Sequence, residues 1–223
     1  MSGWDFPVTR CAGSVEGDID FMNDRSGNIV VYVHGKGGSA EEVGHYRHLF
    51  PCSTVVGFDY HAANPWEAKE EFPRFFSGLR EKCGGITLIA NSIGAFFSMS
   101  SLDKTLVDRA LFISPIVDME RLICDMMLWA GVTETELSEK SLIPTDFGET
   151  LSWEYLSYVR SHPVSWSVPT RILYGERDNL TSVRTVSEFA EKPGVSLTVM
   201  PGGEHWFHTD EQMRFLDAWV TEE

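Results

Sequence analysis

Basic residues are scarce in this sequence. It carries 18 Lys and Arg residues against 33 Asp and Glu residues over 223 positions, which gives a formal net charge of −15 at pH 7. Proteins that bind the phosphate backbone of a nucleic acid, or dock on an anionic membrane, concentrate positive charge where they bind. The composition therefore argues against both kinds of partner, and it mildly disfavours a highly charged anionic substrate.

Cysteine is sparse as well. The four cysteines, Cys11, Cys52, Cys83 and Cys124, lie far apart and form no CxxC pair. Zinc sites and dithiol redox centres commonly use that spacing, so we expect no metal site and no dithiol chemistry. The thiols are typical of small buried residues in a reducing compartment.

Long apolar runs and a targeting signal are also lacking. No stretch approaches 18 uninterrupted apolar residues, the length at which a membrane-spanning helix is indicated. The first ten residues, MSGWDFPVTR, lack the basic start and apolar stretch of a secretory signal. We therefore predict a cytoplasmic protein without a membrane partner; the sequence does not indicate its oligomeric state.

Short apolar runs alternate with stretches of helical periodicity. The runs are nearly continuous rather than alternating, which is typical of strands that are buried on both faces. They are NIVVYV (28–33), STVVGF (53–58), GITLIA (85–90), RALFIS (109–114), TRILYG (170–175) and VSLTVM (195–200), and the helical stretches cover 66–82, 93–103, 182–191 and 209–222. This alternation predicts an α/β fold with a mostly parallel, doubly wound sheet. Residues 7–27 could add an antiparallel edge hairpin.

One interval departs from this alternation. Residues 115–169 contain no convincing strand, but they include helical patterns at 119–131 and 150–162. A simple crossover needs far fewer residues. We therefore expect residues 1–115 and 169–223 to form the core, and residues 116–168 to form a small helical cap inserted over one edge or end of the sheet.

A glycine-rich loop follows the first run, in IVVYVHGKGGSAEE (29–42). Such a loop can present backbone N–H groups to a nucleotide phosphate or to the oxyanion of a reaction intermediate, or it can be a plain turn. A P-loop is excluded because Lys36 precedes the glycine pair. The dinucleotide fingerprint GxGxxG is half matched, since Gly35 and Gly37 are present but Ala40 takes the third position, and Asp59 after the next strand keeps this alternative open.

A second turn helps to decide whether the glycine-rich loop faces a nucleotide phosphate or an oxyanion, or is a plain turn. In GITLIANSIGAFF (85–97) a buried strand runs directly into Ser92, and a helical pattern follows. A serine on so sharp a turn needs small residues two positions before and after it, and Ala90 and Gly94 provide them. This is the pattern of a nucleophile elbow, with Ala in place of the usual first Gly. The alternative is that Ser92 simply caps an ordinary helix.

A serine nucleophile needs a histidine base that is oriented by a carboxylate. Asp178 follows one late strand in LYGERDNLTS, and His205 follows the next in VMPGGEHWFHTDEQ. Loops at the carboxyl ends of parallel strands meet at one edge of the sheet, so these side chains can converge on Ser92. Asp118, after the fourth strand, is an alternative acid. We interpret Glu176 as facing solvent and His208 as part of the entry to the last helix.

Four pieces of the sequence carry a family resemblance: HGKGG (34–38), ANSIG (90–94), GERD (175–178) and GGEHW (202–206). In their order and spacing the chain resembles the α/β-hydrolase superfamily of serine hydrolases from about residue 28 to residue 221. The resemblance implies Ser92 as nucleophile, Asp178 as acid and His205 as base. It also implies an oxyanion hole formed by the backbone N–H groups of Ile93 and Lys36.

The resulting functional hypothesis is a serine hydrolase, similar to carboxylesterases or thioesterases, that cleaves a small ester or thioester through an acyl-enzyme on Ser92. This chemistry needs no metal and no cofactor. Candidate substrate-binding residues are Gly35, His61, Met126, Trp129 and Trp206. The alternatives are a non-catalytic ligand-binding protein of the same fold and, less well supported, a nucleotide-binding oxidoreductase.

Overall fold

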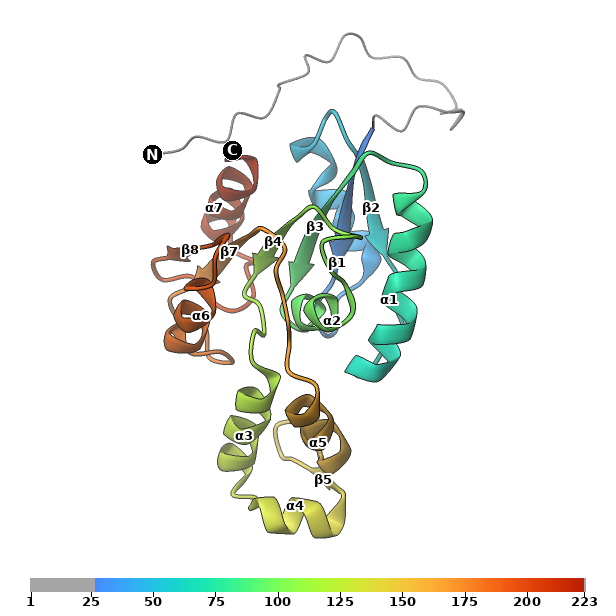
Figure 1. Ribbon diagram of the computed structural model, residues 1–223. Coiled ribbons are helices and arrows are strands. Elements are labelled where there is room, and N and C mark those ends of the chain that lie inside the picture. The colour runs from blue at the N-terminus through green and yellow to red at the C-terminus, as the bar shows by residue number, and fades with distance from the viewer. Residues whose placement is uncertain (1–26, 223) are drawn as a thin grey trace.

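The computed structural model describes residues 27–222, and its centre is a six-stranded parallel sheet (Figure 1). The strand order is β2-β1-β3-β4-β7-β8. The strands are β1 (Asn28–Val33), β2 (Thr54–Phe58), β3 (Gly85–Asn91), β4 (Arg109–Ile113), β7 (Thr170–Gly175) and β8 (Val195–Met200). All six predicted strands form, and every pairing between them is parallel. The possible hairpin within residues 7–27 falls outside the described residues but for Gly27, which is in no strand.

Helices cover both faces of the sheet, as predicted for a doubly wound fold. Buried side chains of α1, α2 and α6 pack against one face, and those of α7 and the 3₁₀ helix η1 pack against the other. The helices are α1 (Pro65–Arg80), α2 (Ile93–Ser101), α6 (Val183–Ala190) and α7 (Asp210–Thr221), with η1 (Ala40–His45) and the short η2 (Arg47–Leu49) between β1 and β2. α7 begins at a capping box, in which the Thr209 side chain accepts from the N–H of Gln212.

The β4–β7 connection, residues 114–169, lies beyond the end of the sheet (Figure 1). Its elements are α3 (Met119–Ala130), α4 (Glu134–Lys140), β5 (Leu142–Pro144), β6 (Thr150–Ser152) and α5 (Trp153–Ser161). The expectation that this interval contains no strand is wrong, because β5 and β6 form an antiparallel hairpin. Strands of three residues are too short to show a periodic pattern, and β6 also displaces the predicted start of α5 from residue 150 to Trp153.

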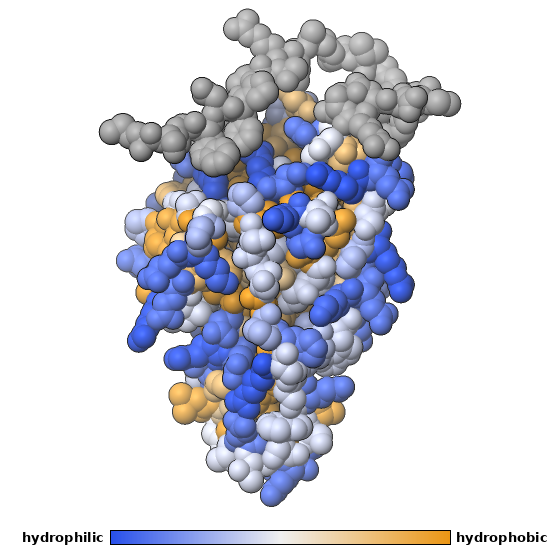
Figure 2. Space-filling view, in the orientation of Figure 1, coloured by the Kyte–Doolittle hydropathy of each residue, from blue (hydrophilic) through white to orange (hydrophobic). Residues whose placement is uncertain are grey.

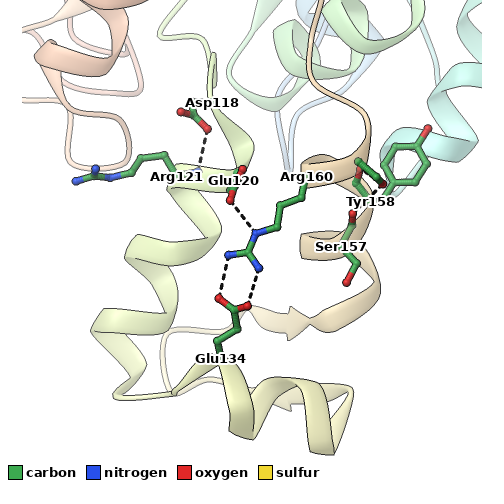
Figure 3. A network of polar contacts seen from close by, with 8 residues as sticks. Asp118, Glu120, Arg121, Glu134, Ser157, Tyr158 and Arg160 are labelled. Atoms are coloured by element: carbon green, nitrogen blue, oxygen red, sulfur yellow. Dashed lines mark hydrogen bonds and ion pairs between the residues drawn. The ribbon is translucent and has the colours of Figure 1, made fainter.

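The β4–β7 connection is held to the rest of the chain and to itself in two ways. Ile123, Met127 and Leu156 are buried in the same apolar cluster as the residues under the first face of the sheet. On the outer side, Arg160 of α5 donates to Glu120 of α3 at 2.7 Å and to both carboxylate oxygens of Glu134 of α4 at 2.7 and 2.9 Å (Figure 3). These bonds from the guanidinium lower the pKa of Glu134.

The surface of the β4–β7 connection is partly apolar. Figure 2 shows apolar patches between hydrophilic areas on this part of the molecule. Leu128 is 77% exposed, Leu142 60%, Trp129 51% and Phe147 46%.

Within residues 27–222, no helix combines the length and apolar character needed to cross a bilayer.

The cysteines do not all behave as expected. Cys83 is buried and free, and Cys124 is half-buried and free. Cys52 is exposed before β2 and is disulfide-bonded. The prediction of buried, reduced thiols therefore holds for Cys83 and is wrong for Cys52, because a turn residue between two elements need not contribute to the core.

Candidate active site

Ser92 alone joins β3 to α2. β3 ends at Asn91 and α2 begins at Ile93, so Ser92 carries the change of direction, with φ 49° and ψ −118°. Such a conformation costs a non-glycine residue about 1–3 kcal/mol, and surrounding contacts must hold it. Its N–H donates to the carbonyl of Ile113 at 3.0 Å, and its own carbonyl accepts from the N–H of Ile116 at 3.1 Å. These two bonds to the end of β4 fix the serine at the carboxyl ends of the strands.

Small residues around Ser92 let the backbone segments approach one another. A Cβ atom on Gly94 would lie 2.3 Å from the carbonyl oxygen of His34, and one on Gly35 would lie 3.2 Å from the Cβ of Ser92. Ala90 is fully buried in the sheet. The glycine loop after β1 therefore packs directly against the serine turn, which explains the small residues that flank Ser92 in the sequence.

Ser92, His205 and Asp178 form a chain of hydrogen bonds. The Oγ of Ser92 lies 2.9 Å from Nε2 of His205, and Nδ1 of His205 lies 2.7 Å from Oδ2 of Asp178. Because a carboxylate only accepts, Nδ1 donates to Asp178, and the lone pair of Nε2 faces the serine hydroxyl. The side chain of Asp178 is 0% exposed and that of His205 is 16% exposed. This arrangement is the one that general-base activation of a serine requires.

The loops after β7 and β8 meet through a glycine contact. A Cβ atom on Gly175 would lie 2.4 Å from the carbonyl oxygen of Glu204. The N–H of Arg177 also donates to the carbonyl of Gly203 at 2.7 Å. Backbone-to-backbone contact of this kind explains how Asp178 and His205, on separate loops, come within hydrogen-bond distance.

Hydrogen bonds to Asp178 and from Tyr174 hold the loop that follows β7 in place. Oδ1 of Asp178 accepts from the N–H groups of Leu180 at 2.8 Å and Thr181 at 3.1 Å. The hydroxyl of Tyr174 donates to the carbonyl of Thr181 at 2.7 Å. Burial, with a smaller contribution from the charge of Asp178, raises the pKa of Tyr174 to about 12, so the hydroxyl remains a donor at neutral pH.

The alternative acid Asp118, and the neighbouring side chains of Glu176 and His208, make other contacts. Asp118 is exposed and caps α3, where it accepts from the N–H of Arg121 at 2.9 Å. Glu176 accepts from the N–H of Gly202 at 2.8 Å. His208 is exposed and contacts the carbonyl of the adjacent Trp206 at the entry to α7. The structure therefore places Asp178, rather than Asp118, against His205.

A cavity of about 990 Å³ opens at Ser92. Its lining comes from the loops after β1, β2 and β7, the turn at Ser92 with α2, and the β4–β7 connection. Both predicted oxyanion donors, Lys36 and Ile93, line it together with Ser92. Apolar side chains of α3 form much of the far wall: Met119, Leu122, Ile123, Met126 and Trp129. The site therefore combines a polar corner with a large apolar chamber.

The five predicted substrate-binding residues divide between two locations. Gly35, Met126 and Trp129 line the cavity. His61 and Trp206 do not: the side chain of His61 is 86% exposed, and Trp206 is 73% exposed. The loop after β2 presents the neighbouring Ala62 and Ala63 to the cavity instead. Position in a loop at the correct sheet edge did not determine which side chains turn inward.

Several lining residues were not predicted. Met119 and Ile123 continue the helical face that contains Met126, so their spacing could have identified them. Glu149, in contrast, reaches the cavity from the turn between β5 and β6, whose packing has no local sequence signal, whereas Tyr155 lies on the predicted helical stretch at 150–162. Burial raises the pKa of the Tyr155 hydroxyl. In residues 27–222 no group of three or more His, Cys, Asp or Glu side chains is arranged to hold a metal ion.

No protein-family model matches the chain, and no curated protein matches it. Solved structures do resemble it. Est1E from Butyrivibrio proteoclasticus has a TM-score of 0.71 at 14% identity, over 90% of this chain and 88% of that chain. The Pyrococcus furiosus esterase Pf2001 has a TM-score of 0.54 at 20% identity, over 87% of this chain and 83% of that one. A soluble variant of the Saccharomyces cerevisiae monoglyceride lipase has a TM-score of 0.58 at 11% identity, over 89% and 86% of the two chains.

Identities this low establish a common architecture and nothing finer. The parallel strand order, the helices on both faces and the serine turn after β3 agree with that likeness. The chain has the α/β-hydrolase fold.

Proposed function

We propose that this protein is a serine hydrolase that cleaves small esters or thioesters. The observation that carries the proposal is the hydrogen-bonded series Ser92–His205–Asp178, with spacings of 2.9 and 2.7 Å. The structural neighbours support it, since the names of two of them describe an esterase and a monoglyceride lipase.

The proposed reaction begins when Ser92 attacks the acyl carbon while Nε2 of His205 takes its proton. Asp178 keeps the imidazole in the required tautomer and stabilises the imidazolium that forms. The backbone N–H groups of Lys36 and Ile93 bind the developing oxyanion. His205 then protonates the leaving alcohol or thiol, and water, activated by the same histidine, releases the acyl group from Ser92.

We assign substrate selection to the β4–β7 connection, in which residues 116–168 act as a cap. Its apolar side chains in the cavity would exclude water from the acyl-enzyme and accommodate the acyl group. The lining includes rings from Phe97, Trp129, Phe147 and Tyr155. Another structure of Est1E contains bound ferulic acid, so a substrate panel should include aromatic as well as alkyl acyl esters.

The test combines a fluorophosphonate probe with an ester panel. Ser92→Ala should abolish labelling and lower turnover by about 10⁶-fold, the scale that removal of a serine nucleophile produces elsewhere. Ser100→Ala is a matched control, because among residues 27–222 its Oγ donates to the carbonyl of Phe96, in the preceding turn of the same helix, and to no other group. It should label and turn over like the wild type, and both variants should melt like the wild type.

Two outcomes would contradict the proposal. Stoichiometric labelling of a folded Ser92→Ala variant would assign the nucleophile to another residue. A wild-type protein that binds esters in the cavity but neither labels nor turns over would instead be a non-catalytic binding protein of this fold.

A further inference from the structure

An ion pair spans the mouth of the cavity. Nζ of Lys36, in the glycine loop after β1, contacts both carboxylate oxygens of Glu149 at 2.6 and 2.5 Å. The two residues are 113 positions apart, and both line the cavity. The pair therefore links the turn next to Ser92 directly to the β4–β7 connection.

The turn that carries Lys36 is held at its start, where Gly35 packs against Ser92 and its carbonyl accepts from Nδ1 of His34, but few bonds close the turn itself. Lys36 lies between Gly35 and the pair Gly37-Gly38, and Gly37 has a positive φ of 75°. One backbone bond closes the turn, from the N–H of Gly38 to the carbonyl of Gly35 at 3.1 Å. A backbone segment built from glycines has more conformational freedom than one built from any other residue type. Across residues 27–222, the Lys36 side chain has no polar contact besides Glu149.

The other partner is held firmly. Glu149 lies at the end of the turn between β5 and β6, where its carbonyl accepts from both the N–H and the hydroxyl of Thr145 at 2.8 Å. Its own N–H donates to the Thr145 hydroxyl at 3.2 Å. In the same turn, the ring of Phe147 packs edge-on against Trp129 of α3, with centroids 6.2 Å apart. The carboxylate is thus presented from a braced hairpin.

We propose that Glu149 is a positioning residue for the reaction: it restrains Lys36 so that the backbone N–H of Lys36 points to the oxyanion. The inference rests on the proposed function, which makes this N–H an oxyanion donor. Because an oxyanion contact strengthens in the transition state, loss of the restraint lowers kcat and leaves the KM of a small ester unchanged.

The expected effect is modest because the pair is exposed to solvent. The side chains of Lys36 and Glu149 are 65% and 38% exposed, and salt screens such pairs. Exposed pairs contribute an amount that corresponds to roughly a two- to five-fold change in rate.

The experiment uses p-nitrophenyl acetate, which is too small to depend on the apolar chamber. Glu149→Gln and Lys36→Met should each lower kcat roughly two- to five-fold, and the double variant should lower it no further. Sodium chloride at about 1 M should bring the wild type down to the Glu149→Gln rate and leave that variant unchanged. Asp146→Asn removes a charge from the same hairpin without touching the pair, and it should behave like the wild type.

A second measurement does not depend on hydrolysis. In the Ser92→Ala background, Glu149→Gln should accelerate hydrogen exchange of the Gly38 amide, which closes the turn, and Asp146→Asn should not. Equal effects of Glu149→Gln and Asp146→Asn, additive single effects or unchanged exchange would overturn the positioning inference. If no variant, nor the wild type, cleaves any ester while exchange responds as expected, the proposed function fails and the restraint stands.

Discussion

The six-stranded sheet and the β4–β7 connection are held together by different forces. Sheet strands are bonded to their neighbours along their length, and the side chains of the four inner strands are mostly buried, as Val31, Leu88 and Phe112 at 0% exposure illustrate. Apart from the 12-residue α3, the elements of the connection have nine residues or fewer. They pack through a few buried side chains and are linked by ion pairs on the outer side, such as the Arg160 network.

The sheet and the β4–β7 connection also contribute different parts of the site. The residues of the proposed chemistry, Ser92, Asp178 and His205, all come from turns and loops that the sheet positions, and backbone bonds fix two of these turns. The connection supplies the chamber instead, through side chains that remain partly exposed, such as Trp129. We infer that the sheet determines reaction type, whereas the connection can vary the substrate without disturbing the chemistry.

The largest expected difference between the two regions is a difference in turnover. It compares one carboxylate from a sheet loop with one from the β4–β7 connection. Asp178→Asn should lower turnover by about 10⁴-fold, because His205 loses the carboxylate that fixes its tautomer and stabilises its charge. Asp118→Asn, in the connection, should leave turnover within a few-fold of the wild type because Asp118 only caps α3. The measurement is the steady-state turnover of both variants on one small ester. A larger loss in Asp118→Asn than in Asp178→Asn would mean that Asp118, in the β4–β7 connection, is the acid.

A smaller effect concerns selectivity. Trp129→Ala and Met126→Ala should shift the preferred acyl chain length, since each methylene that the chamber buries is worth about 0.8 kcal/mol, or roughly four-fold in rate. Activity on the smallest ester should stay within about ten-fold of the wild type. Esters from acetyl to octanoyl provide the measurement. An unchanged profile in a folded variant would mean that these side chains only pack the connection against itself.

The smallest effect concerns the outer ion pairs. Arg160→Gln breaks the bonds that join α5 to α3 and α4, and it should lower the melting temperature by about 2–4 °C at low salt. Because the folded-state pKa of Glu134 is lowered, this contribution is present above the ordinary carboxyl pKa and is lost as the pH falls through the lowered value. Arg184→Gln is the control: it breaks an i,i+4 pair with Glu188 on α6, which is highly exposed, and should change little. Equal melting temperatures of the two variants at low salt and neutral pH would show that the Arg160 network does not stabilise the connection.

Prediction from the sequence succeeded where a pattern was long. All six strands of the sheet and the longer helices α1, α2, α3, α6 and α7 were recognisable, because continuous apolar runs and 3.6-residue periodicity extend over enough positions to be read. It failed at the hairpin of β5 and β6, which has three residues per strand, and at α4, a seven-residue helix rich in charge. Such short elements form only because the surrounding chain packs on them.

The candidate site was also predicted in part: local features were recognised, and contacts between loops were not. Small residues at Ala90 and Gly94 are local requirements of a tight turn, so the sequence indicated the turn at Ser92, whereas the approach of Gly35 to Ser92 appeared only in the structure. The choice between Asp178 and Asp118 was open in the sequence, since both follow strands that end at one edge. The direction of side chains in loops was equally undetermined, which is why His61 and Trp206 were predicted at the cavity and lie outside it.

The sequence by itself determined the class of fold, the order of the strands along the chain and the sharp turn at Ser92, because these depend on periodicity and on steric demands within a few residues. Only the tertiary structure decided which carboxylate meets His205, which walls form the chamber and that Lys36 meets Glu149. Those contacts join residues from 27 to 113 positions apart. Their formation depends on how loops and helices pack together in three dimensions, and no local pattern of residues encodes that packing.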